Sequence, residues 1–158
     1  MKMQSVIFIC FIAPGLPVAA VWANAGDHEH GVGISAAGQS GKLEKASRTI
    51  KIAALDTMRY DKEIIQARPG ETVRFVVTNV GKIKHEFAIG TREEQLEHAE
   101  MMASMPDMQH EEGNAINLEP GATKELIWQF GKAGAVEIAC HLPGHFEAGM
   151  KARVNVKK

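Results

Sequence analysis

Two strand-like segments near the C-terminus flank a short loop that is rich in metal-binding side chains. In the first segment Val136, Ile138 and Cys140 share one face, and in the second Met150 shares a face with Val154. Because successive side chains of a strand point to opposite sides of a sheet, this period of two sends Cys140 and Met150 to the same buried side. The sequence therefore predicts two neighbouring strands whose adjoining ends carry a thiol and a thioether.

The loop between these strands adds an imidazole, because His145 stands midway in a C-x4-H-x4-M spacing. One thiolate, two imidazoles and a weak thioether are the donor set of a mononuclear electron-transfer copper site, with the methionine in the axial position. The second imidazole is expected from His85, which alternates with Phe87 and Ile89 onto one face and so lies at the mouth of the same core. The predicted copper ligands are His85, Cys140, His145 and Met150.

Three other roles for Cys140 have to be weighed against copper binding. A lone cysteine is most often a small buried hydrophobe. A structural zinc site would need four closed nitrogen or sulfur ligands, usually with more cysteines. A Cys/His nucleophile pair would need a third, orienting group, and none is evident in the sequence. The histidine and methionine at ligand spacing favour the copper site over all three.

The motifs at residues 70–75 (GETVRF), 85–87 (HEF) and 140–150 together resemble those of cupredoxins. The resemblance is strongest to the CopI-type copper-tolerance cupredoxins of the bacterial periplasm, and it covers roughly residues 47–158. It implies one type 1 copper, of the green rather than the blue kind, with Cys140 as thiolate donor and electron conduit. Phe87 and Phe146 are then expected to shield the site.

The remaining pattern is typical of an all-β chain. Strand-like segments are expected at residues 49–55, 64–67, 72–80, 85–89, 115–118, 122–130, 136–140 and 150–156. Turns at this spacing favour a Greek-key β-sandwich of about seven or eight strands. Thr91 and Glu94 form a capping-box pattern that opens one short helical insertion, expected to end near Pro106.

Residues 1–25 have the features of a secretory signal peptide: a basic start, an apolar run over residues 6–16 and a small-residue cleavage site at 23–25. The run is too short to span a membrane, so a periplasmic protein without membrane insertion is expected after cleavage. Cleavage also removes Cys10 and leaves Cys140 as a single thiol in an oxidising compartment. Metal ligation would explain why such a thiol persists.

Residues 26–46 are small, polar or charged with little apolar material, which predicts a flexible tail before a domain at 47–158. If cleavage follows Ala25, the mature chain begins with Gly26, Asp27 and His28. A free amine, two amides and an imidazole at position three can hold Cu(II) in a square plane, and His30 adds a donor nearby. The alternative is a solvated tail that merely contains histidines.

A second group of donors lies in and after the predicted helix. Its members are His98, Met101, Met102, Met105, Met108 and His110. Thioethers select Cu(I), and the acidic residues around them favour any cation. The segment is therefore a candidate for additional Cu(I) binding, and the alternative is an ordinary insertion that covers the core.

Two expectations concern the surroundings of the ligands. Asn79 or Val80 is expected to fix the loop that leads to His85. His141 follows Cys140 and should face away from the core, at the surface, where it could serve as an electron exit.

Three functions remain compatible with the sequence. The first is copper tolerance, by sequestering Cu(I) or by oxidising it to Cu(II) in a cuprous oxidase activity. The second is an electron shuttle of a respiratory chain that docks a redox partner, and the third is a chaperone that passes copper to an acceptor protein. The methionine cluster favours the first over the second but does not separate it from the third. The formal net charge of −1 gives no support to nucleic-acid binding, and a monomer is expected.

Overall fold

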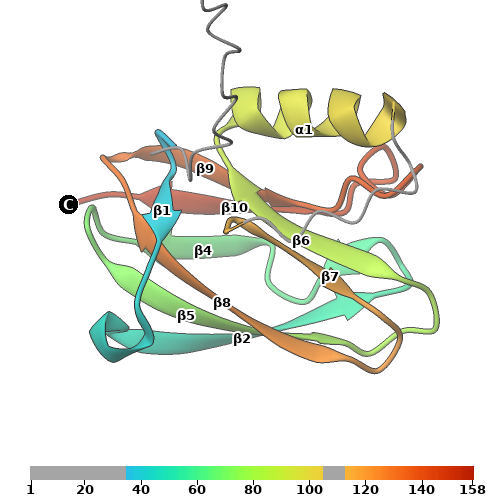
Figure 1. Cartoon of the computed structure of the whole chain (residues 1–158), viewed down its shortest axis with the longest axis horizontal. Coiled ribbons are helices and arrows are strands. Elements are labelled where there is room, and N and C mark those ends of the chain that lie inside the picture. Colours follow the sequence, from blue (N-terminus) through green and yellow to red (C-terminus); the bar gives the residue numbers. More distant parts are fainter. Residues whose placement is uncertain (1–34, 105–112) are drawn as a thin grey trace, which may run out of the picture.

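Two five-stranded sheets face each other in the structure, a computed structural model that describes residues 35–104 and 113–158 (Figure 1). One α-helix lies outside the sheets, so the predicted all-β sandwich with a helical insertion is confirmed. Within the described residues, no helix is long and apolar enough to cross a membrane.

The first sheet has the strand order β1-β8-β5-β2-β3. Its strands are β1 (Gly38–Ser40), β8 (Thr123–Phe130), β5 (Thr72–Asn79), β2 (Arg48–Leu55) and β3 (Arg59–Tyr60). β2 and β5 are parallel, and the other neighbours are antiparallel.

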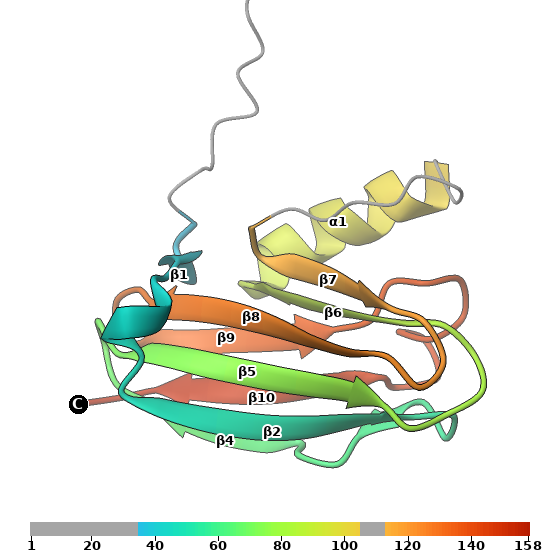
Figure 2. The same ribbon diagram turned by 60° about the horizontal axis from the view of Figure 1, so that its bottom comes forward.

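The second sheet has the order β4-β10-β9-β6-β7. Its strands are β4 (Ile64–Ala67), β10 (Lys151–Val156), β9 (Gly134–Ala139), β6 (His85–Gly90) and β7 (Ala115–Leu118). β10 is parallel to β4 and antiparallel to β9, which in turn pairs with β6. Figure 2 shows the two layers, with β8, β5 and β2 in front of β9, β10 and β4.

The core lies between the sheets and follows from the alternation of the sequence. Val73, Phe75 and Val77 of β5 are fully buried, while the residues between them are half-buried on the outer face. The Phe75 ring lies 5.5 Å from that of Phe87 on β6, so the aromatic side chains bridge the two sheets. Each large side chain buried in this way contributes roughly 1.5–3 kcal/mol to stability.

The helix α1 (Arg92–Ser104) begins at the predicted capping box. The Thr91 N–H donates to Glu94 Oε2 at 2.7 Å, and the Glu94 N–H donates to Thr91 Oγ1 at 3.2 Å. This reciprocal pair satisfies two backbone N–H groups that would otherwise lack an acceptor at the start of the helix. α1 packs against β6 and β9 and covers the outer side of that sheet (Figure 1).

Two short strands of the structure, β1 and β3, lie outside the segments expected from the sequence. β1 falls in the range assigned to a flexible tail, yet it pairs with β8 through Gly38 opposite Phe130. The indole Nε1 of Trp128 also donates to the Ala37 carbonyl oxygen at 3.3 Å, and Ala37 is fully buried. The chain therefore joins the sheet before residue 47, and a short 3-10 helix at Leu43–Lys45 connects β1 to β2. Neither short strand is long enough, at three and two residues, to show an apolar alternation of its own.

Replacing Gly38 by Ala should destabilise the protein by about 2 kcal/mol or more. Gly38 has φ +138°, and a Cβ there would lie 2.1 Å from the Gln129 carbonyl oxygen. The control is Gly134→Ala, where a Cβ meets no atom within 4 Å. Urea unfolding of both variants measures the difference, and equal midpoints would show that β1 is not anchored to β8.

Candidate metal centre

The ends of β9 and β10 meet as the alternation predicts. The Cys140 N–H donates to the Met150 carbonyl oxygen at 3.1 Å, which closes the loop between the two strands. Both side chains are fully buried in the core. Inside the loop, the Met150 N–H donates to the His145 carbonyl oxygen at 3.0 Å, so His145 is held next to the same strand ends.

His85 reaches this loop from β6, which neighbours β9 in the same sheet. It begins β6, whose residues Ala88 and Ile89 pair with Ala139 and Ile138 of β9. The donor atoms of His85, Cys140 and His145 all lie within 4.8 Å of one another. Cys140 Sγ is 3.3 Å from His145 Nδ1, and the two imidazole centroids are 5.2 Å apart.

The state of the His85 ring fits a metal ligand. Its Nε2 lies 3.3 Å from Asp56 Oδ1, and because a carboxylate only accepts, Nε2 carries the proton and donates it. The other nitrogen, Nδ1, is buried and has no hydrogen-bond partner in the described part of the chain. A buried polar atom without a partner is costly, so this lone pair calls for a ligand. A thiolate, two imidazoles and Met150 are the donor set of a type 1 copper site, and the site is formed by His85, Cys140, His145 and Met150.

The electrostatics of the metal-free site favour neutral ligands. Burial lowers the pKa of His85, although Asp56 opposes the shift, and burial together with His85 lowers the pKa of His145. Both imidazoles are therefore uncharged at neutral pH, with a lone pair available. Burial raises the pKa of Cys140 to about 12, so a metal that binds there must displace the thiol proton.

Glu86, the residue after His85, makes one hydrogen bond to the thiol and two to histidines nearby. Its backbone N–H donates to Cys140 Sγ at 3.3 Å, and its carboxylate Oε2 accepts from the His141 N–H at 2.9 Å. Its other carboxylate oxygen accepts from His98 Nε2 at 3.0 Å. Burial alone would raise the pKa of Glu86, but these hydrogen bonds and the nearby histidines lower it. Hydrogen bonds to a ligand sulfur tune the metal, so Glu86 acts on the site without being a ligand.

Asn79 fixes the turn before β6, which is one of the two alternatives expected from the sequence. The fully buried Asn79 Nδ2 donates to the Ile83 and Leu118 carbonyl oxygens at 2.7 and 2.9 Å, and its Oδ1 accepts from the Gly81 N–H at 2.9 Å. Val80 is 58% exposed, and its backbone N–H donates to the Ala54 carbonyl oxygen at 3.1 Å, so its side chain does not fix the turn.

Asp56 was not anticipated from the sequence. It lies after β2, far from the ligands along the chain, and its carboxylate accepts from the Lys82 N–H at 2.8 Å as well as from His85. Gly81 makes this approach possible, because a Cβ there would lie 1.8 Å from Asp56 Oδ1. No local motif marks such a contact, since it depends on the pairing of distant strands.

The prediction that His141 lies at the surface was wrong. Its side chain does point away from the core, but α1 and Phe146 cover it, and it is only 6% exposed. Its Nε2 lies 2.6 Å from Gln95 Oε1, and its ring stacks on Phe146 at a centroid distance of 5.0 Å. Burial, followed by the charge of His98, lowers the pKa of His141 to about 4. Gln95 was not singled out from the sequence.

Of the candidate secondary copper ligands, only His98, Met101 and Met102 lie in the described residues. His98 lies on the inner side of α1 and bonds Glu86, Met102 is buried, and Met101 is half-buried. The other candidates lie outside the described residues: His28, His30, Met105, Met108 and His110. For Phe87 the structure shows a fully buried ring between Tyr60 and Phe75.

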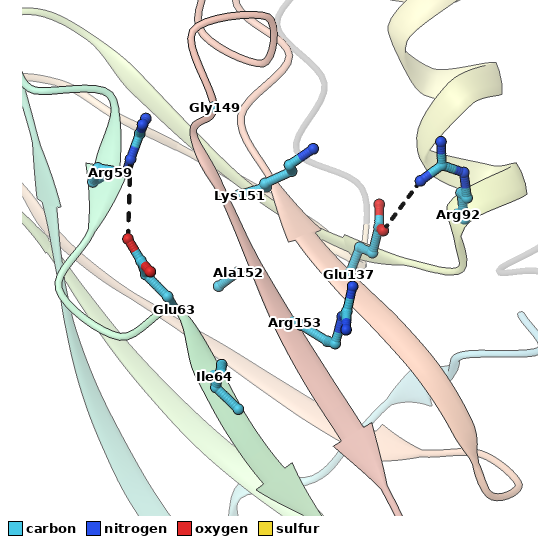
Figure 3. A pocket seen from close by; sticks show the side chains of 9 residues that line it. All are labelled: Arg59, Glu63, Ile64, Arg92, Glu137, Gly149, Lys151, Ala152 and Arg153. Atoms are coloured by element: carbon cyan, nitrogen blue, oxygen red, sulfur yellow. Dashed lines mark ion pairs between the residues drawn. The ribbon is translucent and has the colours of Figure 1, made fainter.

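A shallow basic cleft of about 410 Å³ lies next to the metal loop, beside Gly149 (Figure 3). Its basic side chains are Arg59, Arg92, Lys151 and Arg153. Figure 3 shows two of them facing glutamates, with Arg59 3.9 Å from Glu63 and Arg92 3.8 Å from Glu137. The lining thus carries four basic and two acidic side chains.

Replacing Asn79 by Ala should cost roughly 2–4 kcal/mol of unfolding free energy, because the buried Leu118 carbonyl and the partly buried Ile83 carbonyl lose their donor. Val80→Ala changes the neighbouring, exposed side chain and should alter stability by less than about 0.5 kcal/mol. Chemical denaturation of the metal-free protein checks both values. A small effect of Asn79→Ala would mean that the turn is held by other contacts.

The Cys140 thiol of the metal-free protein should resist alkylation at pH 8. Its burial and raised pKa leave little thiolate, so iodoacetamide should react roughly 100-fold or more slowly than with the unfolded chain. Protein that lacks residues 1–25 contains Cys140 as its single cysteine, which makes the mass shift unambiguous. Equal rates in the folded and urea-unfolded protein would contradict the buried site.

Comparison with known proteins places this geometry in a family. The model of copper-binding proteins of the plastocyanin/azurin family matches residues 45–157. The copper-resistant cuproprotein CopI of Rubrivivax gelatinosus is 48% identical over 85% of this chain and 81% of its own length. The CopI proteins of Vibrio cholerae and Pseudomonas aeruginosa are 38% and 34% identical, over 88% and 76% of this chain and 92% and 82% of theirs.

Solved structures show the same fold. Reduced auracyanin from Roseiflexus castenholzii superposes with a TM-score of 0.61 at 23% identity, over 72% of this chain and 99% of its own. Auracyanin B gives a TM-score of 0.64 at 17% identity, over 80% of this chain and all of its own. Since the type 1 copper site is complete and the sequence matches span most of both partners, the chain belongs to the plastocyanin/azurin family of copper-binding proteins and, within it, to the CopI cuproproteins.

Proposed function

We propose that this protein acts in the periplasm and protects cells against copper. It would bind copper at the type 1 site and remove Cu(I) through oxidation or sequestration. The observation that carries the proposal is the donor set of His85, Cys140 and His145 in a chain that is 48% identical to a copper-resistant cuproprotein. The periplasmic location rests on the signal-peptide features of residues 1–25.

The core site is suited to accept an electron. When bound, copper in such a donor set alternates between Cu(I) and Cu(II). The chain holds its own ligands in place before the metal arrives: Asp56 orients His85, and the backbone of Met150 closes the loop. The Glu86 N–H on the Cys140 sulfur and the surrounding apolar core keep water away from the thiolate.

A protein that handles Cu(I) also needs soft donors outside the core site. The sequence offers thioethers at Met101, Met102, Met105 and Met108, with further imidazoles in the N-terminal region. Thioethers prefer Cu(I) over harder cations, so this segment would collect the ion that the core site then oxidises. A plain electron shuttle has no use for such a cluster.

The electron shuttle remains the second candidate because of the basic cleft. Arg59, Lys151 and Arg153 line a surface next to the metal loop, where an acidic redox protein would find charge complementarity. A role as copper chaperone would instead require that the bound copper pass intact to an acceptor protein.

Growth of a deletion strain in copper-containing medium tests the proposed function. The unmodified gene should restore tolerance, and Cys140→Ser should not, because the thiolate is lost. Replacing the four clustered methionines by leucine should weaken tolerance while the purified protein keeps its intense thiolate-to-copper absorption with Cu(II). Full tolerance in both variants would refute the proposal.

The same strains separate the alternatives. Rapid reduction of the core copper by a partner protein, with no copper phenotype on deletion, would establish the shuttle. Stoichiometric transfer of copper to an acceptor apoprotein would establish the chaperone.

A further inference from the structure

Two buried side-chain nitrogens in the described part of the chain lack a hydrogen-bond partner, and both belong to histidines. They are His85 Nδ1 and His141 Nδ1. The type 1 copper explains the first. The second belongs to the residue that follows Cys140, and neither the core site nor the fold accounts for it.

The tautomer of His141 follows from its neighbour Gln95. The Gln95 amide Nε2 donates to the Ala88 and Glu137 carbonyl oxygens, both at 2.9 Å, which fixes the orientation of the amide. Its Oε1 therefore faces His141 Nε2 at 2.6 Å and can only accept. Nε2 carries the ring proton, so Nδ1 presents a bare lone pair, as His85 Nδ1 does.

The His141 ring is also held in place on its faces. Phe146 stacks on it with an interplanar angle of 28°, and the His98 ring meets it edge-on at a centroid distance of 5.2 Å. Its backbone N–H is bound by the buried Glu86 carboxylate. A ring fixed in this way cannot turn Nδ1 toward another partner, which makes the lone pair a preorganised donor.

A cleft of about 390 Å³ lies beside this ring, between α1 and the loop after β9. His141 and Met102 line it together, and Glu147 contributes a carboxylate. Met102 is 3% exposed. It lies on the same face of α1 as Gln95, which is seven residues, or about two helical turns, away. The residues that line the cleft thus include one with a thioether, one with an imidazole and one with a carboxylate.

These donors select the ligand. A structural zinc ion would need four closed ligands, and Ca²⁺ or Mg²⁺ would need several oxygens. A thioether with an imidazole instead suits a soft monovalent cation. We propose that His141 Nδ1 and the Met102 sulfur form a second copper site, which takes up Cu(I) in the cleft between α1 and the metal loop.

This site rests on the proposed function and gives Cu(I) a defined place on the chain. Because His141 follows Cys140 directly, a ligand of the cleft site and the thiolate ligand of the core would be neighbours along the chain. With copper bound at both sites, one electron would pass from Cu(I) in the cleft to type 1 Cu(II), giving Cu(II) in the cleft and Cu(I) in the core. The harder Cu(II) ion binds a thioether less well, which favours its release.

The test compares Met102→Leu with Met58→Leu, a methionine packed against the core and outside the methionine cluster, both in the Cys140→Ser protein purified from the periplasm, so that the core thiolate does not compete. Leucine is close to methionine in volume, and both variants should fold. Cu(I) is titrated against a coloured bicinchoninate chelator. Met102→Leu should raise the dissociation constant of the cleft ion at least tenfold, and Met58→Leu, whose side chain does not line the cleft, should leave it unchanged. Equal affinities in the two variants would overturn the proposal.

A second measurement follows the histidine directly. Cu(I) is diamagnetic, so long-range ¹H–¹⁵N spectra of the Cys140→Ser protein can report both nitrogens of His141. Addition of Cu(I) should shift the Nδ1 resonance and leave the Nε2 resonance, bound to Gln95, nearly unmoved. An unmoved Nδ1 would overturn the site.

The core site is monitored separately in the Met102→Leu variant that retains Cys140. Intense thiolate-to-copper absorption with Cu(II), together with unchanged Cu(I) affinity, would refute the cleft site and leave the proposed function standing. Loss of copper tolerance in the Cys140→Ser strain is a separate result that bears only on the proposed function.

Discussion

The site depends on one residue that binds both ligand segments at once. Glu86 follows the ligand His85, and its backbone N–H reaches the sulfur of Cys140 while its carboxylate accepts from the backbone of His141. The two segments are far apart in the chain, so this buried residue fixes the distance between an imidazole and the thiolate. The Tyr60 hydroxyl donates to the Glu86 carbonyl oxygen and ties the first sheet to the same point. The metal geometry is in this sense a property of the sandwich rather than of the loop.

Burial gives the site its chemical character. The same burial that keeps Cys140 protonated in the absence of metal also keeps the imidazoles of His85 and His145 neutral, so that each has a lone pair available. Copper thus exchanges with a single proton at the sulfur and finds the other donors ready. The ligand side chains should therefore move little when copper binds, because they are held by contacts that do not involve the metal, such as that of Asp56 with His85.

The alternation of apolar residues was sufficient to predict the core site. Cys140 and Met150 had to share a face, and the capping box at Thr91 located the helix correctly. His141 shows where this reasoning ended: the period of two placed its side chain on the outer side, as observed, but could not show that α1 covers that side. The inner face of α1 carries Gln95, His98 and Met102 instead of an apolar stripe, so its docking left no signal in the sequence. Asp56 was missed for a related reason, since its contact depends on tertiary structure alone.

The short strand β1 has a consequence for self-association. β8 is an eight-residue strand, and β1 pairs with its last three residues, from Trp128 to Phe130. The Gly41 N–H extends this cover by donating to the Ile127 carbonyl oxygen. An uncovered strand edge with aromatic residues is a template for pairing with another molecule. A newly made chain therefore exposes this end of β8 until the segment around Gly38 has folded onto it, and from that step on its last three residues are no longer open to pairing with another molecule.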